Sequence, residues 1–169
     1  METNKKIYNA ILKLSRDAEL SQRASDFARC KKMGINAYSR PMLAGAYHLN
    51  GETMICNGFY GAIFNGEIDN LQMVEGKGEY LDLHKILTTD KIKLATKQCE
   101  YDIDEMRNLL KLNKNANYTI DKSLYQLKYL LSILDCFDNC KLYCENDNKM
   151  SALIFKGTNG IGILLPLRQ

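Results

Sequence analysis

The stretch MLAGAYHLNGETMICNGFYGAIFNGEI, residues 42–68, decides the fold because three Asn-Gly pairs divide it into short apolar segments. The pairs are Asn50-Gly51, Asn57-Gly58 and Asn65-Gly66. Asn-Gly readily supplies the positive φ angles that a two-residue hairpin turn requires. The stretch therefore predicts an antiparallel meander of short strands.

A second meander is predicted at the end of the chain. Its segments are KLYCE (141–145), SALIFK (151–156) and GIGILLPL (160–167), joined by polar turns. Leu164 and Leu165 are adjacent, so we expect both faces of the last strand to be covered. Pro166 has no N–H to donate to a neighbouring strand, which suits an edge or the end of a strand.

Helical periodicity lies outside the two meanders. Apolar stripes predict two tightly joined helices before residue 34, divided at Asp17, and a short helix in residues 102–113. A further helix is predicted over residues 121–138, with Asp121 as its N-cap and Leu127, Leu131 and Leu134 on its buried face. Between them, Ile92 and Leu94 alternate as in a strand.

This order of elements predicts an α+β fold, an antiparallel sheet with packed helices. Residues 1–35 form a helical N-terminal segment, and residues 36–169 form the main domain. With 169 residues, we expect the two parts to make one compact domain.

Composition points to a globular protein, with 46% apolar and 25% charged residues. The sequence contains neither an apolar run of the roughly 20 residues that span a bilayer nor a pattern typical of a secretory signal. We therefore expect a cytoplasmic protein without a membrane partner.

The net charge of +3 is concentrated near the N-terminus, where residues 1–42 hold nine Lys or Arg against four acids. This basic excess suits an acidic or phosphate-bearing partner. A solvated helix face is the alternative explanation.

The six cysteines include a cluster, Cys136, Cys140 and Cys144, in the stretch CFDNCKLYC. Zinc sites usually combine two pairs of ligands, but a second pair is missing and the two histidines, His48 and His84, are isolated. We predict reduced, metal-free thiols and no cofactor.

Sequence motifs for catalysis are missing as well. The chain contains no Gly-x-Ser-x-Gly, no Walker loop and no His-Glu-x-x-His. The acids Asp102, Asp104 and Glu105 cluster where a helix start favours negative charge. We therefore expect a non-enzymatic protein.

Two stretches resemble a family. Residues 39–68 are similar to the first half of a bacterial DNA polymerase III beta-subunit (sliding-clamp) domain, which runs Arg-Pro-x-Leu-x-Gly, strand, turn, strand. Residues 118–169 resemble the end of the last clamp domain, a helix and three strands closing on apolar-Pro-apolar-Arg. The chain departs from the family in its more helical first 35 residues, in Asn57-Gly58 for Asp-Gly, and in Tyr60 for a frequent Arg.

The resemblance implies a single DNA-clamp-like domain that functions in DNA replication or repair. A bacterial clamp subunit has three such domains, so a ring of this chain would be a homo-oligomer of about six copies. In the family the C-terminal ending lines a groove for short clamp-binding peptides of polymerases and repair proteins. The corresponding residues here are Ile163, Leu165, Pro166, Leu167 and Arg168.

The family's DNA side is basic and contacts the phosphates of double-stranded DNA without reading sequence. Arg40 matches the basic position of the Arg-Pro motif. Expected helix placement adds Lys5, Lys6, Lys13, Lys122 and Lys128. The alternative is a small regulatory protein-interaction module, derived from a phage or mobile element, that uses the clamp fold without encircling DNA.

Overall fold

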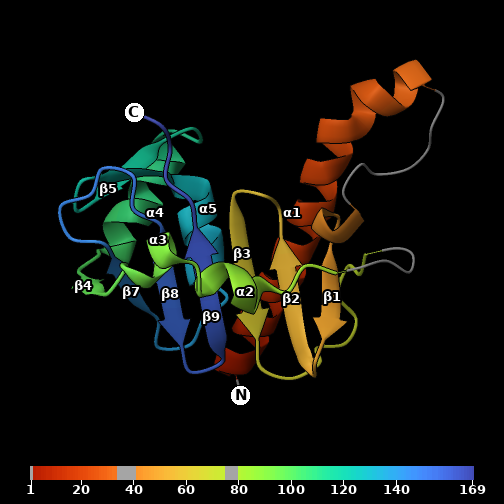
Figure 1. Cartoon of the computed structure of the whole chain (residues 1–169), viewed down its shortest axis with the longest axis horizontal. Helices are drawn as coiled ribbons and strands as arrows, with labels where there is room; N and C mark the ends of the chain where they lie inside the picture. The colour runs from red at the N-terminus through yellow and green to blue at the C-terminus, as the bar shows by residue number, and fades with distance from the viewer. Residues whose placement is uncertain (1, 34–40, 75–79) are drawn as a thin grey trace. The chain divides into compact units, whose positions relative to one another are not determined.

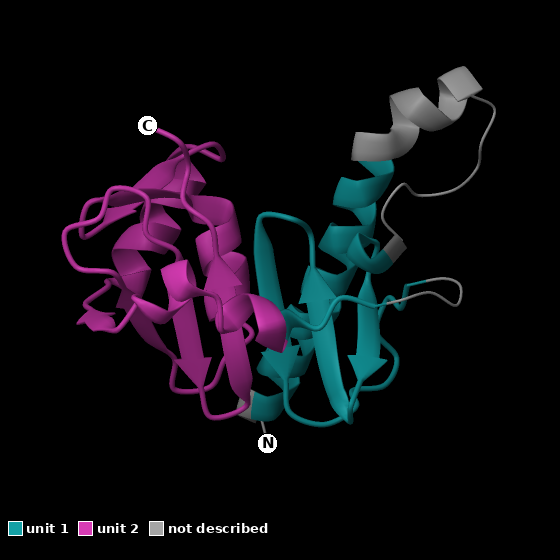
Figure 2. Cartoon of the chain, viewed as in Figure 1, with its two compact units in different colours: residues 1–83 teal, residues 84–169 magenta. Residues whose placement is uncertain are grey.

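The computed structural model describes residues 2–33, 41–74 and 80–169 and, in the first helix, the side chains of residues 4–24. The chain divides into two compact units, Met1–Leu83 and His84–Gln169 (Figure 2). Their boundary lies within the part of the sequence that we assigned to the main domain. Each unit combines helices with antiparallel strands, as the α+β prediction requires.

The first unit contains one long helix and a three-stranded antiparallel sheet (Figure 1). Its elements are α1 (Glu2–Met33), the 3-10 turn η1 (Pro41–Leu43), β1 (Ala46–Leu49), β2 (Glu52–Cys56) and β3 (Tyr60–Phe64). The predicted meander is confirmed. Asn50 and Gly51 form the β1–β2 turn with φ angles of 53° and 78°, and Leu49 pairs with Glu52 beside it.

The prediction of two N-terminal helices is wrong, because α1 is continuous. Residues 2–33 contain neither Gly nor Pro to interrupt the helix. Asp17, where we placed the break, instead lies 3.6 Å from the Lys13 ammonium group one turn earlier. The buried side of the helix packs on β2 and includes Ile11, Leu14 and Ala18.

The second unit contains a four-stranded antiparallel sheet in the order β9-β8-β7-β4 and a separate hairpin, β5-β6. Its elements are α2 (Leu83–Leu87), α3 (Asp90–Lys93), β4 (Lys97–Cys99), α4 (Ile103–Leu112), β5 (Asn117–Ile120), β6 (Ser123–Gln126), α5 (Leu127–Leu134), β7 (Lys141–Cys144), β8 (Leu153–Gly157) and β9 (Gly160–Leu164). The predicted helix at 102–113 and the three last strands are confirmed.

Both faces of this sheet are covered, but not through the adjacent Leu164 and Leu165 as we expected: Leu164 is buried, whereas Leu165 follows the end of β9 and is exposed. On one face, Ile154 and Ile163 form a core cluster with Ala95, against which Ile86 and Ile92 of α2 and α3 pack. On the other face, α5 contacts β9.

The strand expected at Ile92 and Leu94 is wrong. Residues 90–93 form α3, in which Thr89 accepts the backbone N–H groups of Ile92 and Lys93. Ile92 is half-buried in the core cluster and Leu94 is exposed. The two apolar residues that suggested a strand are therefore one residue of a helical turn, Ile92, and one exposed residue after it, Leu94.

The helix predicted over residues 121–138 begins later, at Leu127. Residues 117–126 form the hairpin β5-β6, and Asp121 is not an N-cap but a turn residue with a φ angle of 54°. The buried hydroxyl of Tyr125 donates to the carbonyl oxygen of Ser151 at 2.7 Å, which holds β6 as a strand. The expected burial of Leu127, Leu131 and Leu134 is confirmed.

Phe137, just after α5, packs against the sheet where two strands carry glycine. A Cβ atom at Gly162 would lie 2.9 Å from the Phe137 ring, and one at Gly157 would lie 2.8 Å from the Phe137 Cβ. The ring stacks on Phe155 with a centroid distance of 6.3 Å. Only glycine leaves room for this close approach.

Within the described ranges, the structure contains no helix that combines the length and apolar character needed to cross a membrane.

Candidate functional site

Four basic residues line the exposed side of α1. Lys5, Lys6, Lys13 and Arg16 are all exposed. At 3.6 residues per turn, these positions fall within about 100° of one another around the helix axis, opposite the buried Ile11 side. Positions 5 and 16 are separated by about 16 Å along the axis, at 1.5 Å per residue. We call these four residues the α1 basic stripe.

The charges of the α1 basic stripe are largely available to a partner. Among the described residues, Lys5, Lys6 and Arg16 have no ion-pair partner. Lys13 pairs with Asp17 in an exposed contact, and such contacts contribute little, so a phosphate can replace the carboxylate. The neighbouring Arg23 is different, because its guanidinium group forms an ion pair with the carboxylate of the buried residue Glu19, with an N–O distance of 2.5 Å.

Of the other three predicted DNA-binding residues, Lys122 and Lys128 lie in the second unit. Arg40 lies outside the described residues. Lys122, in the β5–β6 turn, forms an ion pair with Asp147. Lys128 is exposed on α5, and its ammonium group lies 5.1 Å from the centre of the Tyr129 ring. Lys122 is thus already partnered within the second unit.

The C-terminal segment is anchored beside β6. The backbone N–H of Leu167 donates to the carbonyl oxygen of Leu124 at 2.7 Å, although β9 already ends at Leu164. Of the predicted groove residues, Ile163 is buried in the core cluster, whereas Pro166 and Leu167 are half-buried. Leu165 is 45% exposed, and Arg168 is exposed.

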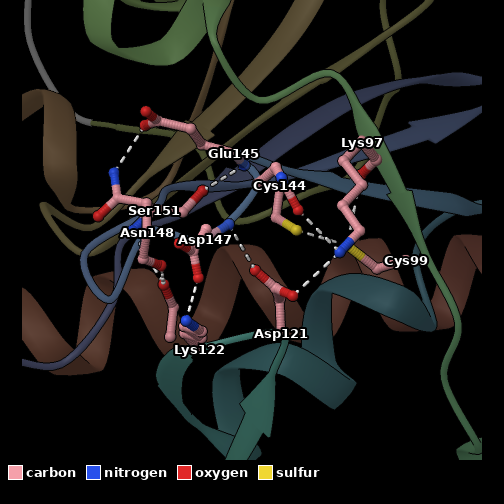
Figure 3. A network of polar contacts seen from close by, with 11 residues as sticks. Lys97, Cys99, Asp121, Lys122, Cys144, Glu145, Asp147, Asn148 and Ser151 are labelled. Atoms are coloured by element: carbon pink, nitrogen blue, oxygen red, sulfur yellow. Dashed lines mark hydrogen bonds and ion pairs between the residues drawn. The ribbon is translucent and has the colours of Figure 1, made fainter.

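A polar network joins β4, the β5–β6 turn and the loop after β7 (Figure 3). The Lys97 ammonium group donates to Asp121 Oδ1 at 3.0 Å and to Asn146 Oδ1 at 3.1 Å. Asp121 Oδ2 accepts the backbone N–H of Asp147 at 3.0 Å. The hydrogen bond from Lys97, helped by the one from Asp147, lowers the pKa of the Asp121 carboxyl. The network therefore holds the loop against the hairpin turn.

Two thiols meet beside this network. The sulfur atoms of Cys99 on β4 and Cys144 on β7 are 2.7 Å apart, and Figure 3 shows them facing each other. Cys99 pairs with Leu142, two residues before Cys144, so both cysteines lie on the same face of the sheet. Burial, and then the hydrogen bond with Cys144, raises the pKa of the Cys99 thiol to about 12.

Sequence reasoning missed this thiol pair. It grouped Cys144 with Cys136 and Cys140, which are its neighbours along the chain. In the structure Cys136 is buried after α5, where its thiol donates to the carbonyl oxygen of Ser132, and Cys140 is half-buried. Only the pairing of β4 with β7 brings Cys99 to Cys144, across 45 residues of sequence.

The described part of the chain contains no group of three or more His, Cys, Asp or Glu side chains placed to hold a metal ion. The absence of metal from Cys136, Cys140 and Cys144 remains a prediction for the purified protein.

The fold defines an α+β protein built from short antiparallel strands and packed helices. Comparison with family models, with curated proteins and with solved structures gives no match to this chain. Its function must therefore be argued from the α1 basic stripe, the C-terminal segment and the network beside the thiol pair.

Proposed function

We propose that this chain is a non-enzymatic, sliding-clamp-like protein that binds double-stranded DNA through phosphate contacts. The α1 basic stripe is the observation that carries this proposal. A rigid helix presents Lys5, Lys6 and Arg16 on the side opposite its packed face, without described ion-pair partners. Such a stripe can neutralise phosphates but has no feature for reading bases, which is the mode expected for a clamp.

The order of elements supports the clamp-like part of the proposal. In each unit a helix is followed by a three-stranded antiparallel meander: α1 precedes β1-β2-β3, and α5 precedes β7-β8-β9. A helix followed by three strands is the order that the resemblance of residues 118–169 implies. A homo-oligomer is part of the proposal, and light scattering of the purified chain measures it directly.

The test compares two triple variants with the same net charge. The first replaces Lys5, Lys6 and Arg16 by Ala, and the matched control replaces Lys91, Lys114 and Lys149, three exposed lysines of the second unit. Fluorescence anisotropy of a labelled duplex, measured at several salt concentrations, gives the affinity and its salt dependence.

We expect the α1 variant to bind more weakly. The slope of log affinity against log salt should fall by about 0.9 for each phosphate that is no longer neutralised, up to about 2.7 for all three side chains. The control should retain the slope of the original chain. Equal weakening in both variants would indicate a general charge effect and contradict the stripe. A chain that does not bind DNA at all would favour the regulatory module.

The C-terminal segment supports a second candidate function, the binding of clamp-binding peptides. Its backbone is fixed at Leu167, yet the side chain of Leu165 remains 45% exposed. A fixed backbone with an exposed apolar side chain and Arg168 nearby suits an apolar peptide that ends in a carboxylate. Fluorescence polarisation with a labelled Gln-Leu-x-Leu-Phe peptide tests it, with Leu165→Ser as the variant and Leu94→Ser, another exposed leucine, as the control. Binding that is absent, or equal in both variants, would refute the peptide site.

A further inference from the structure

The geometry of Cys99 and Cys144 points to a modification site: we propose that these two thiols form a reversible disulfide bond with a small-molecule disulfide such as oxidised glutathione as the oxidant. The inference goes beyond the proposed function and does not depend on it. Two thiols on the same face of adjacent strands, with sulfur atoms 2.7 Å apart, need only a small shift to reach bonding distance.

The surroundings of the pair distinguish its two members. Cys99 is 9% exposed on β4, the last strand in the order β9-β8-β7-β4, whereas Cys144 is fully buried. Cys99 is therefore the thiol that the oxidant reaches first. Cys144, already in contact with it, is placed to complete the bond. The Cys99 thiol also lies 3.4 Å from the carbonyl oxygen of Lys97, and the thiols of Cys136 and Cys140 donate to backbone carbonyl oxygens elsewhere in the unit.

The reaction proceeds by two thiol–disulfide exchanges. The Cys99 thiolate attacks one sulfur of oxidised glutathione, forms a mixed disulfide and releases one glutathione thiolate, which takes up the proton that Cys99 lost. The Cys144 thiolate then attacks the Cys99 sulfur, the Cys99–Cys144 bond forms and the second glutathione leaves, taking up the proton of Cys144. The protein loses two electrons and two protons, and oxidised glutathione becomes two thiols.

The bond would attach β4 covalently to β7. β4 is only three residues long, and in the reduced protein it is held by its pairing with β7 and by the hydrogen bond from Lys97 to Asp121. Cys99 and Cys144 are 45 residues apart in the sequence, and a cross-link that closes a loop of that length removes conformational freedom from the unfolded chain. Oxidation should therefore stabilise the edge of the sheet against local opening.

Peptide mapping of the original chain gives the direct test. The protein is incubated with oxidised glutathione, remaining thiols are blocked with N-ethylmaleimide, and the chain is digested with trypsin without reduction. Cys99 falls in peptide 98–107 and Cys144 in peptide 142–149, while Cys136 and Cys140 share peptide 129–141. We expect peptides 98–107 and 142–149 to appear joined, lighter by two hydrogens than their sum, and to separate after dithiothreitol.

Further measurements make the result specific. Because the raised pKa of Cys99 leaves little thiolate at neutral pH, the rate should rise about tenfold per pH unit between pH 7 and pH 9. The oxidised chain should unfold roughly 5–15 °C above the reduced one. Cys99→Ser should abolish the joined peptides, and Cys140→Ser should retain them. Peptides 98–107 and 142–149 that carry only N-ethylmaleimide or separate glutathione adducts would overturn the proposal. An unchanged thermal midpoint of the cross-linked chain would contradict the stabilisation of the sheet edge by the bond.

Discussion

Leu167 donates its backbone N–H to the carbonyl oxygen of Leu124 at 2.7 Å, so the C-terminal segment remains attached to β6 after the sheet ends. Deletion of Leu167–Gln169 removes this bond and the half-buried Leu167 side chain. We expect a folded protein whose free energy of unfolding, measured with urea, is about 1–3 kcal/mol smaller.

The matched control deletes Gln169 alone, whose side chain donates to the carbonyl oxygen of Lys122 at 3.3 Å on the surface. This change should alter the free energy of unfolding by less than about 0.5 kcal/mol. Complete unfolding after the longer deletion would mean that the segment seals the sheet and does not serve as a peptide-binding wall.

Leu131 of α5 is 4% exposed, and its replacement by Ala should destabilise the protein by about 2–5 kcal/mol. The destabilisation combines the transfer free energy of the removed carbons with the cavity that they leave. Lys128→Ala on the exposed side should change stability by less than about 1 kcal/mol, because it removes only an exposed interaction with the Tyr129 ring. Urea midpoints of the two variants measure the difference, and a harmless Leu131→Ala would show that α5 is not packed as described.

The network around Asp121 predicts a pH dependence of stability. Its hydrogen bonds lower the pKa of the carboxyl in the folded chain below the ordinary value of the unfolded chain. The stability that these hydrogen bonds add is therefore fully present above about pH 4, and it is lost as the pH falls through the lower pKa of the folded state. Asp121→Asn should flatten the acid limb of the stability curve, because the amide of Asn does not titrate. Asn also tolerates the positive φ angle at this position, so the turn should be retained.

Urea unfolding at neutral and acidic pH measures this effect, and solvent screening of the exposed pair should keep it small. Asp69→Asn provides the control, because Asp69 is an exposed carboxylate of the first unit. An acid limb that is equally steep in the original chain and in Asp121→Asn would contradict the assigned role of the network.

The purified protein should contain far less than one equivalent of zinc or iron, and chelators should leave its thermal midpoint unchanged. Cys136 is buried after α5 and Cys140 is half-buried, and with Cys144 they belong to no group of metal-ligating side chains among the described residues. Elemental analysis of the protein after gel filtration is the measurement. A stoichiometric metal that survives purification would overturn this assignment.

Local chemistry explains which parts of the fold were predictable. The β1–β2 hairpin follows from Asn50 and Gly51. A two-residue hairpin turn requires positive φ angles at these positions whatever packs around it, and Asn and Gly adopt them readily. The hairpin at 117–126 was missed because Leu124 and Leu127 also match the helical spacing of α5. The hydrogen bond from the Tyr125 hydroxyl to Ser151 decides between the two structures, and sequence periodicity does not contain it.

The candidate sites divide in the same way. The α1 basic stripe was predictable in part, because charged residues one or two turns apart on a helix share a side wherever the helix packs. The pairing of Cys99 with Cys144 depends on β4 joining the sheet beside β7, after β4 and β7 have been separated by α4, a hairpin and α5. Strand order of this kind arises from tertiary packing, so residue spacing does not reveal it.

The packing of the Phe137 ring on Gly162 makes the side-chain volumes at these two positions interdependent. The Phe137 ring occupies the space that a side chain at Gly162 would fill, so a methyl group added there collides with the ring at 2.9 Å. Gly162→Ala alone should therefore be costly, whereas Phe137→Leu should make room for it. Homologous chains can consequently drift between an aromatic residue over glycine and an aliphatic residue over alanine, provided that both positions change together.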